Sequence, residues 1–530
     1  MGKSFLKTKW IATAASIWIQ CTSGATYTFG IYSSILKSSQ SYDQSTLDTV
    51  SVFKDIGANA GILSGLLYSS VTTTPAAAPG AFLVAPGWST WPGPSSAFLA
   101  AHAQTFFNTA NVVSGVENFQ PFGGTIVGIM KGFLGLSGAV LIQLYNTLSE
   151  GDPATFILIL SVLPTLVSLT LMPLVQIYGT SSVHEKKHLN GFSSIAVVIA
   201  AYLMVIIILR NIFTFPLWTQ IITFGILVLL LASPVGVAIK AHRESERLLQ
   251  AETSPLMDDP EPIPPTKCSR LQDPAPEGYH EIPGEPGQGK AVASSSGSNL
   301  VDDDEQDINL LRAMLSLDFW LLFIAMICGM GSGLATINNI SQIGESLGYT
   351  STERSSLVSL WSIWNFLGRF GAGYVSDIFL HKGWARPLFM VITLATLTFG
   401  HLIVASGFTG NLYIGSIVVG ICYGSQWSLM PTITSEIFGV RHMGTIFNTI
   451  AIASPVGSYI FSVRVIGHFY DKVATGEDNS CYGSQCFMLS FFIMASVAFL
   501  GFLVAFALFL RTRRFYRQVV LKRLRHSSTS

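Results

Sequence analysis

The sequence predicts an all-α multi-pass membrane protein with about fourteen membrane spans, in two hydrophobic blocks separated by a polar stretch. Two observations carry this prediction. Of the 530 residues, 49% are hydrophobic and only 11% are charged, whereas roughly a quarter of the residues in soluble proteins are charged. The hydrophobic residues also gather in long runs between short polar segments, with a mean hydropathy of +0.49 for the chain. Such a chain belongs in a bilayer.

The polar stretch at residues 241–312 reads as a disordered cytosolic linker. It holds about half of the 30 acidic residues, its prolines are crowded, and its apolar residues show no period. A segment of this composition buries too little surface to offset its ordering entropy. Basic residues elsewhere flank the hydrophobic runs and do not gather on one face, which argues against nucleic-acid binding.

The expected spans follow the hydrophobic runs in order. Before the linker they cover residues 11–36, 49–70, 95–115, 123–148, 154–178, 192–209 and 216–240. After it they cover residues 318–343, 355–379, 387–406, 412–438, 444–466 and 487–510. Each has about 20 residues or more, enough to cross about 30 Å of hydrocarbon at about 1.5 Å per residue.

One further span is expected at residues 71–101, although prolines crowd this stretch and should prevent an ordinary helix. Lys3, Lys7 and Lys9 put the amino terminus in the cytosol. The basic loop 184–188 and the linker are then cytosolic only if an even number of spans precedes each. We therefore expect a distorted third span, with an altered local sequence as the competing explanation. The basic tail at 512–530 then also lies in the cytosol.

Two segments echo each other at matching places in the two blocks. Both have an acidic residue, one intervening residue, a phenylalanine, a short loop and then Gly-Thr at the start of an apolar run; they are residues 117–125 and 436–445. An echo of this kind indicates duplicated halves. Glu117, Glu436 and Arg441, which lie in or beside these segments, are candidate gate residues.

A second motif lies between the expected spans 355–379 and 387–406. Gly373, Asp377 and the later Arg386 resemble the loop motif of the major facilitator superfamily, in which an acid and bases latch the two halves together. The basic residue usual after the acid is replaced by Ile378, and the corresponding first-half loop has lost its charges within the proline-rich stretch. The resemblance implies a latch of Gly373, Asp377 and Arg386, but puts a symmetric one in doubt.

Longer segments resemble the plant nodulin-like group of that superfamily, which includes the nuclear-fusion-defective proteins. They include MKGFLGLSGAVLIQLYNTL from Met130 and YGSQWSLMPTITSEIFGVRHMGTIFN from Tyr423. The resemblance implies a nodulin-like N-terminal helix bundle at 1–180, two additional transmembrane helices at 181–240, the linker at 241–312, a C-terminal six-helix bundle at 313–511 and the tail at 512–530. It implies transport and no other chemistry.

Charged residues inside a span are costly and are candidates for function. Lys131 lies well within the span 123–148, and Arg369 follows Asn365 by one helical turn. Asn365, Arg369 and Gly373 are similar to a helix of monocarboxylate transporters in which Arg holds a carboxylate; there the position of Asn365 is an acid that carries a proton. The alternatives are a purely structural Lys131 and an Arg369 that belongs to the latch. Asn59 and Gln426 are further binding candidates, although such residues more often only pack.

Two features lie outside the spans. Cys481 and Cys486 fall in one non-cytosolic loop and could form a disulfide in an oxidising compartment. Glu244, Leu248 and Leu249 resemble an acidic dileucine sorting signal, with a continuation of the preceding helix as the equal alternative. Neither a metal-ligand spacing nor a phosphate-binding loop nor a catalytic constellation is present in the sequence, so we expect no cofactor and no enzyme activity.

The sequence thus predicts a secondary transporter that works by alternating access on a small solute, with an organic anion as a candidate. The expected partners are that solute, the lipid bilayer and sorting adaptors at the linker, but no nucleic acid. A non-transporting receptor or scaffold that keeps a transporter fold is the alternative. The expected location is a vacuolar or other endomembrane or the plasma membrane, with both termini in the cytosol.

Overall fold

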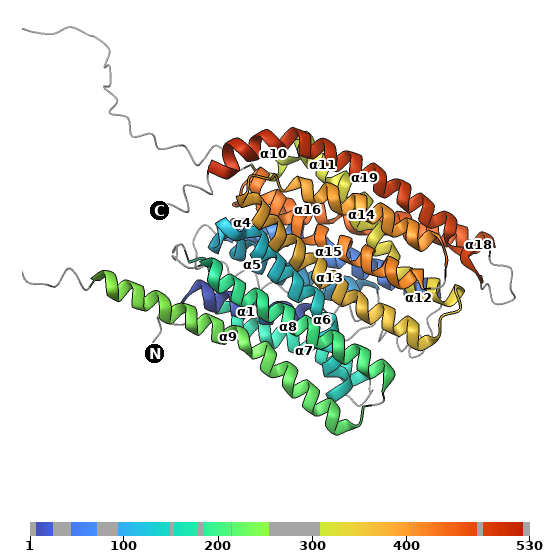
Figure 1. Ribbon diagram of the computed structural model, residues 1–530, viewed down its shortest axis with the longest axis horizontal. Helices are drawn as coiled ribbons and strands as arrows, with labels where there is room; N and C mark the ends of the chain where they lie inside the picture. The colour runs from blue at the N-terminus through green and yellow to red at the C-terminus, as the bar shows by residue number, and fades with distance from the viewer. Residues whose placement is uncertain are drawn as a thin grey trace, which may run out of the picture. The chain divides into compact units, whose positions relative to one another are not determined.

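The structure is a computed structural model that describes residues 7–24, 44–71, 94–148, 153–178, 185–213, 215–253, 308–408, 410–473 and 481–522. Over these ranges the chain is helical and forms no strand (Figure 1). Residues 1–243 and 307–530 make up one compact unit, and residues 244–306 make up a second, of which only the helical residues 244–253 are described.

The first block consists of helices that follow the expected spans closely. They are α1 (Lys9–Ser23), α3 (Gln44–Asn59), α4 (Ile62–Val71), α5 (Pro94–Asn118), α6 (Gly123–Leu148), α7 (Pro153–Leu171), α8 (Glu185–Ile212) and α9 (Leu217–Thr253). Short 3-10 turns, η3 (Gln120–Phe122) and η4 (Met172–Leu174), precede α6 and follow α7.

The second block repeats this plan with more irregular helices. It consists of α10 (Leu310–Leu315), α11 (Leu317–Met326), η7 (Ile327–Gly331), α12 (Ser332–Ser346), α13 (Ser351–His381), α14 (Pro387–Ala405), α15 (Asn411–Phe438), α16 (Met443–Ala451), α17 (Ala453–Ser458), η8 (Tyr459–Gly467), α18 (His468–Val473), η9 (Ser484–Cys486), α19 (Met488–Phe515) and η10 (Tyr516–Val520). The π-helical η7 and η8 lie inside two of the expected spans. Helices α14 and α19 pack side by side along their length (Figure 1).

Seven helical stretches among the described residues are long and apolar enough to cross a membrane. Over the described residues, every expected span outside 71–101 falls on a helix or on a run of consecutive helices, and residues 25–36 of the first expected span lie outside the described residues. Residues 72–93, which hold most of the expected third span, lie outside the described residues. The all-α multi-pass fold is thus confirmed.

The direction of the helices around residues 72–93 agrees with the parity argument. Ser64 of α4 hydrogen-bonds Thr109 of α5 (2.8 Å between hydroxyl oxygens), and Tyr68 bonds Ser114 further along both helices (3.0 Å). Residue numbers therefore increase in the same direction on both helices, which run parallel. Two parallel helices begin on the same side of a membrane, as expected if one further crossing separates them.

Three expected boundaries differ from the helix ends in the structure. Helix α9 continues to Thr253, well past residue 241, because its charged extension contains good helix formers and no proline before Pro255. At the other end of the expected linker, Asn309 caps α10, whose first residue is Leu310. The expected tail at 512–530 begins as helix as well: α19 and η10 extend to Val520 and bury Tyr516 and Val520 against Leu380 and Ala385.

The two blocks meet most extensively along two pairs of helices. One pair is α6 with α13, and the other is α4 with α16. Gly65 of α4 lies against the backbone of Gly444 and Thr445, with a distance of 2.6 Å from the position of an added Cβ to the Gly444 carbonyl carbon. Such positions admit only a glycine, as is common where membrane helices approach closely.

Helix α8, one of the two additional helices, contacts both blocks. Its Glu185 forms a buried ion pair with Lys9 of α1, and its His188 and Phe192 pack on Trp10 of the same helix. On its other side, Asn190 accepts a hydrogen bond from Tyr374 of α13 (3.2 Å). Helix α8 is therefore fixed to the first block and also touches an interface helix of the second.

Candidate transport site and latch

Lys131 of α6 and Arg369 of α13 meet at the interface between the blocks. Arg369 donates through Nη1 to the backbone carbonyl of Lys131 (3.0 Å) and through Nε to Asn365 Oδ1 (2.8 Å). Both cations are buried, with exposed fractions of 1% and 0%. Three candidates from the sequence are therefore neighbours, although Lys131 is far from the other two along the chain.

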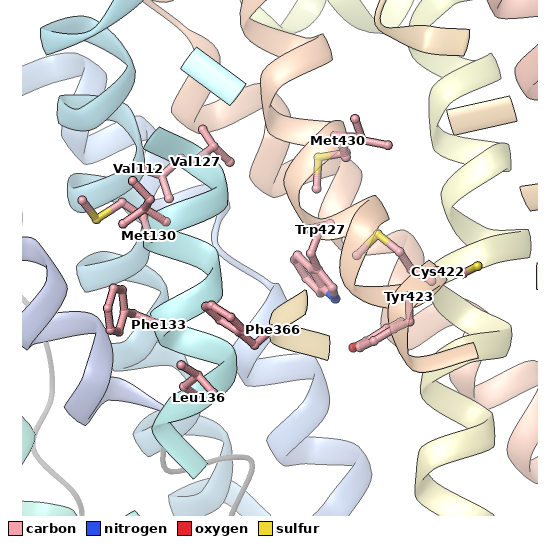
Figure 2. Packing of buried hydrophobic residues seen from close by; sticks show 14 of the residues in the cluster. Val112, Val127, Met130, Phe133, Leu136, Phe366, Cys422, Tyr423, Trp427 and Met430 are labelled. Carbon is pink, nitrogen blue, oxygen red and sulfur yellow. The ribbon is translucent and has the colours of Figure 1, made fainter. Parts of the chain in front are cut away.

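The two cations share one aromatic ring. The Trp427 ring centroid lies 5.1 Å from Lys131 Nζ and 5.6 Å from Arg369 Cζ, and the Phe447 centroid lies 5.2 Å from Lys131 Nζ. Trp427 projects from α15 (Figure 2) and Phe447 belongs to α16. Each such contact contributes about 0.5–2 kcal/mol, which offsets only part of the desolvation of a buried cation. We call Lys131, Arg369, Asn365, Trp427 and Phe447 the central cluster.

Glycines on α6 bring α13 close enough to form this cluster. A Cβ added at Gly128 would lie 3.1 Å from the carbonyl oxygens of Arg369 and Phe370, and one at Gly132 would lie 3.0 Å from the Phe366 ring. Phe366 points from α13 toward α6 (Figure 2). The glycine run that surrounds Lys131 in the sequence is therefore the surface on which α13 packs.

The other two binding candidates lie elsewhere. Asn59 donates to the carbonyl of Asp55 in its own helix (2.7 Å). The Gln426 amide packs over Gly329 of η7, so it is directed away from the partners of its neighbour Trp427. Although Gln426 is fully buried, its oxygen and nitrogen have no hydrogen-bond partner among the described residues. Within the described residues, neither Asn59 nor Gln426 forms a hydrogen bond with Lys131 or Arg369.

The predicted latch residue Asp377 caps the first turn of α6. Its two carboxylate oxygens accept hydrogen bonds from the backbone N–H groups of Gly124 (3.0 Å) and Thr125 (2.5 Å). A carboxylate at a helix N-terminus satisfies donors that have no partner within the helix and is stabilised by the helix dipole. The bond joins an acid of the second block to a helix of the first. Gly373 lies one helical turn before Asp377 and close to α6. A Cβ added at Gly373 would lie 2.9 Å from Gly128 Cα.

Arg386 links Asp377 to the end of α15. Its Nη2 lies 2.7 Å from Asp377 Oδ1 and 2.8 Å from Glu436 Oε1, and its Nη1 also bonds Ser376. Burial lowers the pKa of the Arg386 guanidinium, but the charges of Glu436 and Asp377 raise it by more, so the pKa lies above its usual value. The arginine therefore keeps its charge and holds both carboxylates. We call Asp377, Arg386 and Glu436 the latch.

Tyr516 completes the latch from the end of the chain. Its hydroxyl donates to Glu436 Oε2 (2.7 Å), and the ring is buried with an exposed fraction of 1%. No signal in the sequence indicates this contact, since Tyr516 lies among basic residues of the expected tail. Ser376 was also missed, because its bond to Arg386 depends on the turn that brings Arg386 back onto α13.

The remaining gate candidates do not join the latch among the described residues. Glu117 is half-buried at the end of α5, near Tyr68. Arg441 is exposed in the turn between α15 and α16. At the start of α16, Gly65 of α4 lies against Gly444 much as Gly373 lies against Gly124, but no hydrogen bond from Gly444 or Thr445 to a carboxylate is found among the described residues. The latch is therefore one-sided within the part of the chain that the structure describes.

The structure also describes the two features that lie outside the expected spans. Cys481 and Cys486 form a disulfide, with Cα atoms 5.9 Å apart. Glu244 and Leu248 lie on the helical extension of α9, half-buried and exposed respectively, and Leu249 belongs to the same extension. The residues of the dileucine pattern therefore lie on a helix.

Comparison with known proteins agrees with the two-block plan. A family model described as Nodulin-like matches residues 9–91 and 95–239, and one described as NFD4, C-terminal domain, matches residues 304–518. The Arabidopsis thaliana protein NUCLEAR FUSION DEFECTIVE 4 is 26% identical over 550 residues, which cover 96% of this chain and 90% of that protein. Probable transporter MCH1 of Yarrowia lipolytica is 27% identical over 217 residues, 38% of this chain and 44% of the relative.

Among solved structures, the proton:xylose symporter XylE of the major facilitator superfamily superposes with a TM-score of 0.51, at 10% sequence identity and over 95% of each chain. Two blocks that meet along α6–α13 and α4–α16, with this superposition, define a multi-pass membrane protein with the major facilitator fold, and the similar proteins support membrane transport as its function. The chain belongs to the nodulin-like family, with an NFD4-type C-terminal domain.

Proposed function

We propose that the protein is a secondary transporter that carries a small organic anion by alternating access, with the anion bound at the central cluster. The observation that carries this proposal is the meeting of Lys131 and Arg369, from the two blocks, over the ring of Trp427. Two buried cations in a membrane protein are costly unless they serve a ligand or a partner. Their position between the blocks is the place where transporters of this kind bind their substrates.

The latch supports the part of the proposal that concerns the movement of the two blocks. Asp377 holds the start of α6 only while the two blocks are together at that end of the bundle. Separation at this end would break two charge-assisted hydrogen bonds, each with about 1.5–3 kcal/mol. We propose that this end faces the cytosol, as the basic residues near it suggest, and that solute release there requires the latch to open.

Solute counterflow in vesicles tests the proposal. Purified protein is reconstituted with an unlabelled carboxylate inside, and the uptake of the same labelled carboxylate is followed. The expected result is uptake that Lys131→Ala and Arg369→Ala each abolish while thermal unfolding shows a folded protein. A control variant is Arg441→Ala, since Arg441 is exposed and outside the cluster. Uptake that survives both cluster variants would remove the site.

A second function is favoured by one observation. Among the described residues, no carboxylate bonds the start of α16 as Asp377 bonds the start of α6, so the latch lacks its symmetric counterpart there. A receptor or scaffold that keeps the fold would tolerate this loss. A folded protein with no flux of any solute, whose linker retains a partner, would favour that function.

The cellular setting is part of the proposal. We propose a vacuolar or other endomembrane or the plasma membrane, with both termini in the cytosol. The extension of α9 is then a cytosolic helix on which Glu244 and Leu248 are placed for sorting adaptors. Replacing Leu248 and Leu249 by alanine in a fluorescently tagged chain would redistribute it if adaptors read this pattern.

A further inference from the structure

The ammonium group of Lys131 has no conventional partner among the described residues. Among the described residues, Lys131 accepts a hydrogen bond through its backbone carbonyl, but no hydrogen bond or ion pair involves its ammonium group, whose contacts are the rings of Trp427 and Phe447. The side chain is 1% exposed. The contrast with Lys9 and Lys54 is informative, because these two buried lysines pair with Glu185 and Asp55. An ammonium group offers three donors and no acceptor.

A second donor at the same place is also without a partner. The indole Nε1 of Trp427 is buried and makes no hydrogen bond within the described part of the chain. It belongs to the ring over which Lys131 and Arg369 lie. An indole N–H can only donate. The two unpartnered groups of the central cluster are therefore both donors, and the chemical complement of such a set is a group that only accepts.

The neighbouring Arg369 is oriented by neutral partners. Its bonds to Asn365 Oδ1 and to the Lys131 carbonyl fix the guanidinium beside the same ring. Lys131 Nζ and Arg369 Cζ lie 5.1 Å and 5.6 Å from the same Trp427 ring centroid. The two charged groups are therefore no farther apart than about 11 Å. A ligand that contacts both charges therefore has to span no more than this distance.

We propose that the central cluster binds carboxylates through Lys131 Nζ and Trp427 Nε1, and that the protein is an obligatory anion exchanger. This inference rests on the proposed transport function. Alternating access requires the blocks to close over the cluster in each half-cycle. Closing over an unneutralised ammonium removes its water and supplies no counter-charge, which is strongly unfavourable. Closing over an ammonium paired with a carboxylate removes most of this cost, so only the loaded protein crosses between its two states.

Exchange and net efflux separate this inference from the function on which it rests. Vesicles are loaded with labelled lactate, succinate or citrate, which carry one, two and three carboxylates. Efflux is then measured into buffer with or without the same unlabelled carboxylate. The expected result is efflux that is at least roughly tenfold faster with carboxylate outside. Equal efflux in both buffers would overturn obligatory exchange and leave carboxylate transport standing.

The same efflux measurement is repeated with labelled xylose, a neutral solute, in place of the carboxylates. If no carboxylate moves in either buffer while xylose does, the carboxylate site is overturned and a transporter remains. If neither xylose nor any carboxylate moves through folded protein, both the inference and the proposed anion transport are contradicted. Each result therefore identifies which statement has failed.

Trp427→Phe tests the donor, because it keeps an aromatic ring under the cations and removes the N–H together with part of the indole. Since buried ring atoms are removed, the variant should fold but unfold at a somewhat lower temperature than the parent, as should the same substitution at another buried tryptophan. Loss of one hydrogen bond to a charged group should raise the carboxylate concentration for half-maximal exchange roughly tenfold or more. Trp361→Phe, at another buried tryptophan, is the matched control and should leave it unchanged. An unchanged half-maximal concentration in Trp427→Phe would contradict the assignment of Nε1.

Discussion

Two glycines on α13, two positions apart, should respond oppositely to the same substitution. An added Cβ at Gly371 meets no atom within 4 Å. At Gly373 the added Cβ would lie 2.8 Å from Ser428 Oγ and 2.9 Å from Gly128 Cα. Real Cβ atoms do not approach so closely, and the backbone of α6 can yield only by moving away from α13.

The magnitude follows from two effects. Replacing glycine by alanine in a helix stabilises it by roughly 0.5–1 kcal/mol, and this gain applies at both positions. Overpacking at Gly373 costs about 1–3 kcal/mol. Gly371→Ala should therefore be neutral or stabilising, and Gly373→Ala should be less stable than Gly371→Ala by about 1–3 kcal/mol, since the helix term cancels in the comparison.

Thermal unfolding of the purified variants in the same detergent measures this difference. The expected order of unfolding temperature is Gly371→Ala at or above the parent, with Gly373→Ala below both. Because Gly373 lies beside Asp377, the second variant should also loosen the contact between α13 and the start of α6. Equal unfolding temperatures for the two variants would refute the close approach of α6 and α13 at the latch.

Three further outcomes are expected from the same structure. Asp377→Asn removes the charge that caps α6 and pairs with Arg386, and should lower stability by about 3 kcal/mol in thermal unfolding; an unchanged unfolding temperature would contradict the latch. Tyr516→Phe removes the hydroxyl that donates to Glu436 and should cost about 1 kcal/mol, with Tyr482→Phe, at an exposed ring, as a neutral control. Cys481→Ser opens a short loop and should cost about 2 kcal/mol or less; the parent, but not this variant, should lose stability on adding reductant.

The sequence predicted the fold well because hydropathy and charge are local signals. Helix positions and the repeat of Glu117 and Glu436 could be recognised from spacing and residue type, and the latch of Asp377 and Arg386 was implied by the resemblance to a known loop motif. The boundaries at Thr253 and Leu310 were less accurate, because composition alone does not show where a charged helix ends.

The site was predictable only in part. Buried charge identified Lys131 and Arg369, since an ionisable residue within a span is conspicuous at any position. The rotation of α15 was not predictable, and it decides that Trp427 faces these cations while its neighbour Gln426 faces Gly329. Tyr516 was missed because its contact with Glu436 depends on how α19 packs, which no local pattern records.

Movement of the two blocks at the latch is the central claim, and a distance measurement between them tests it most directly. Spin labels at Gln120 and Lys382, both exposed, would report on the first and second block at the latch end. We expect two populations of distance in lipid, a short one with the latch formed and a longer one with it open, and Asp377→Asn should enlarge the longer one. A single distance, unchanged by that variant and by added carboxylate, would contradict alternating access.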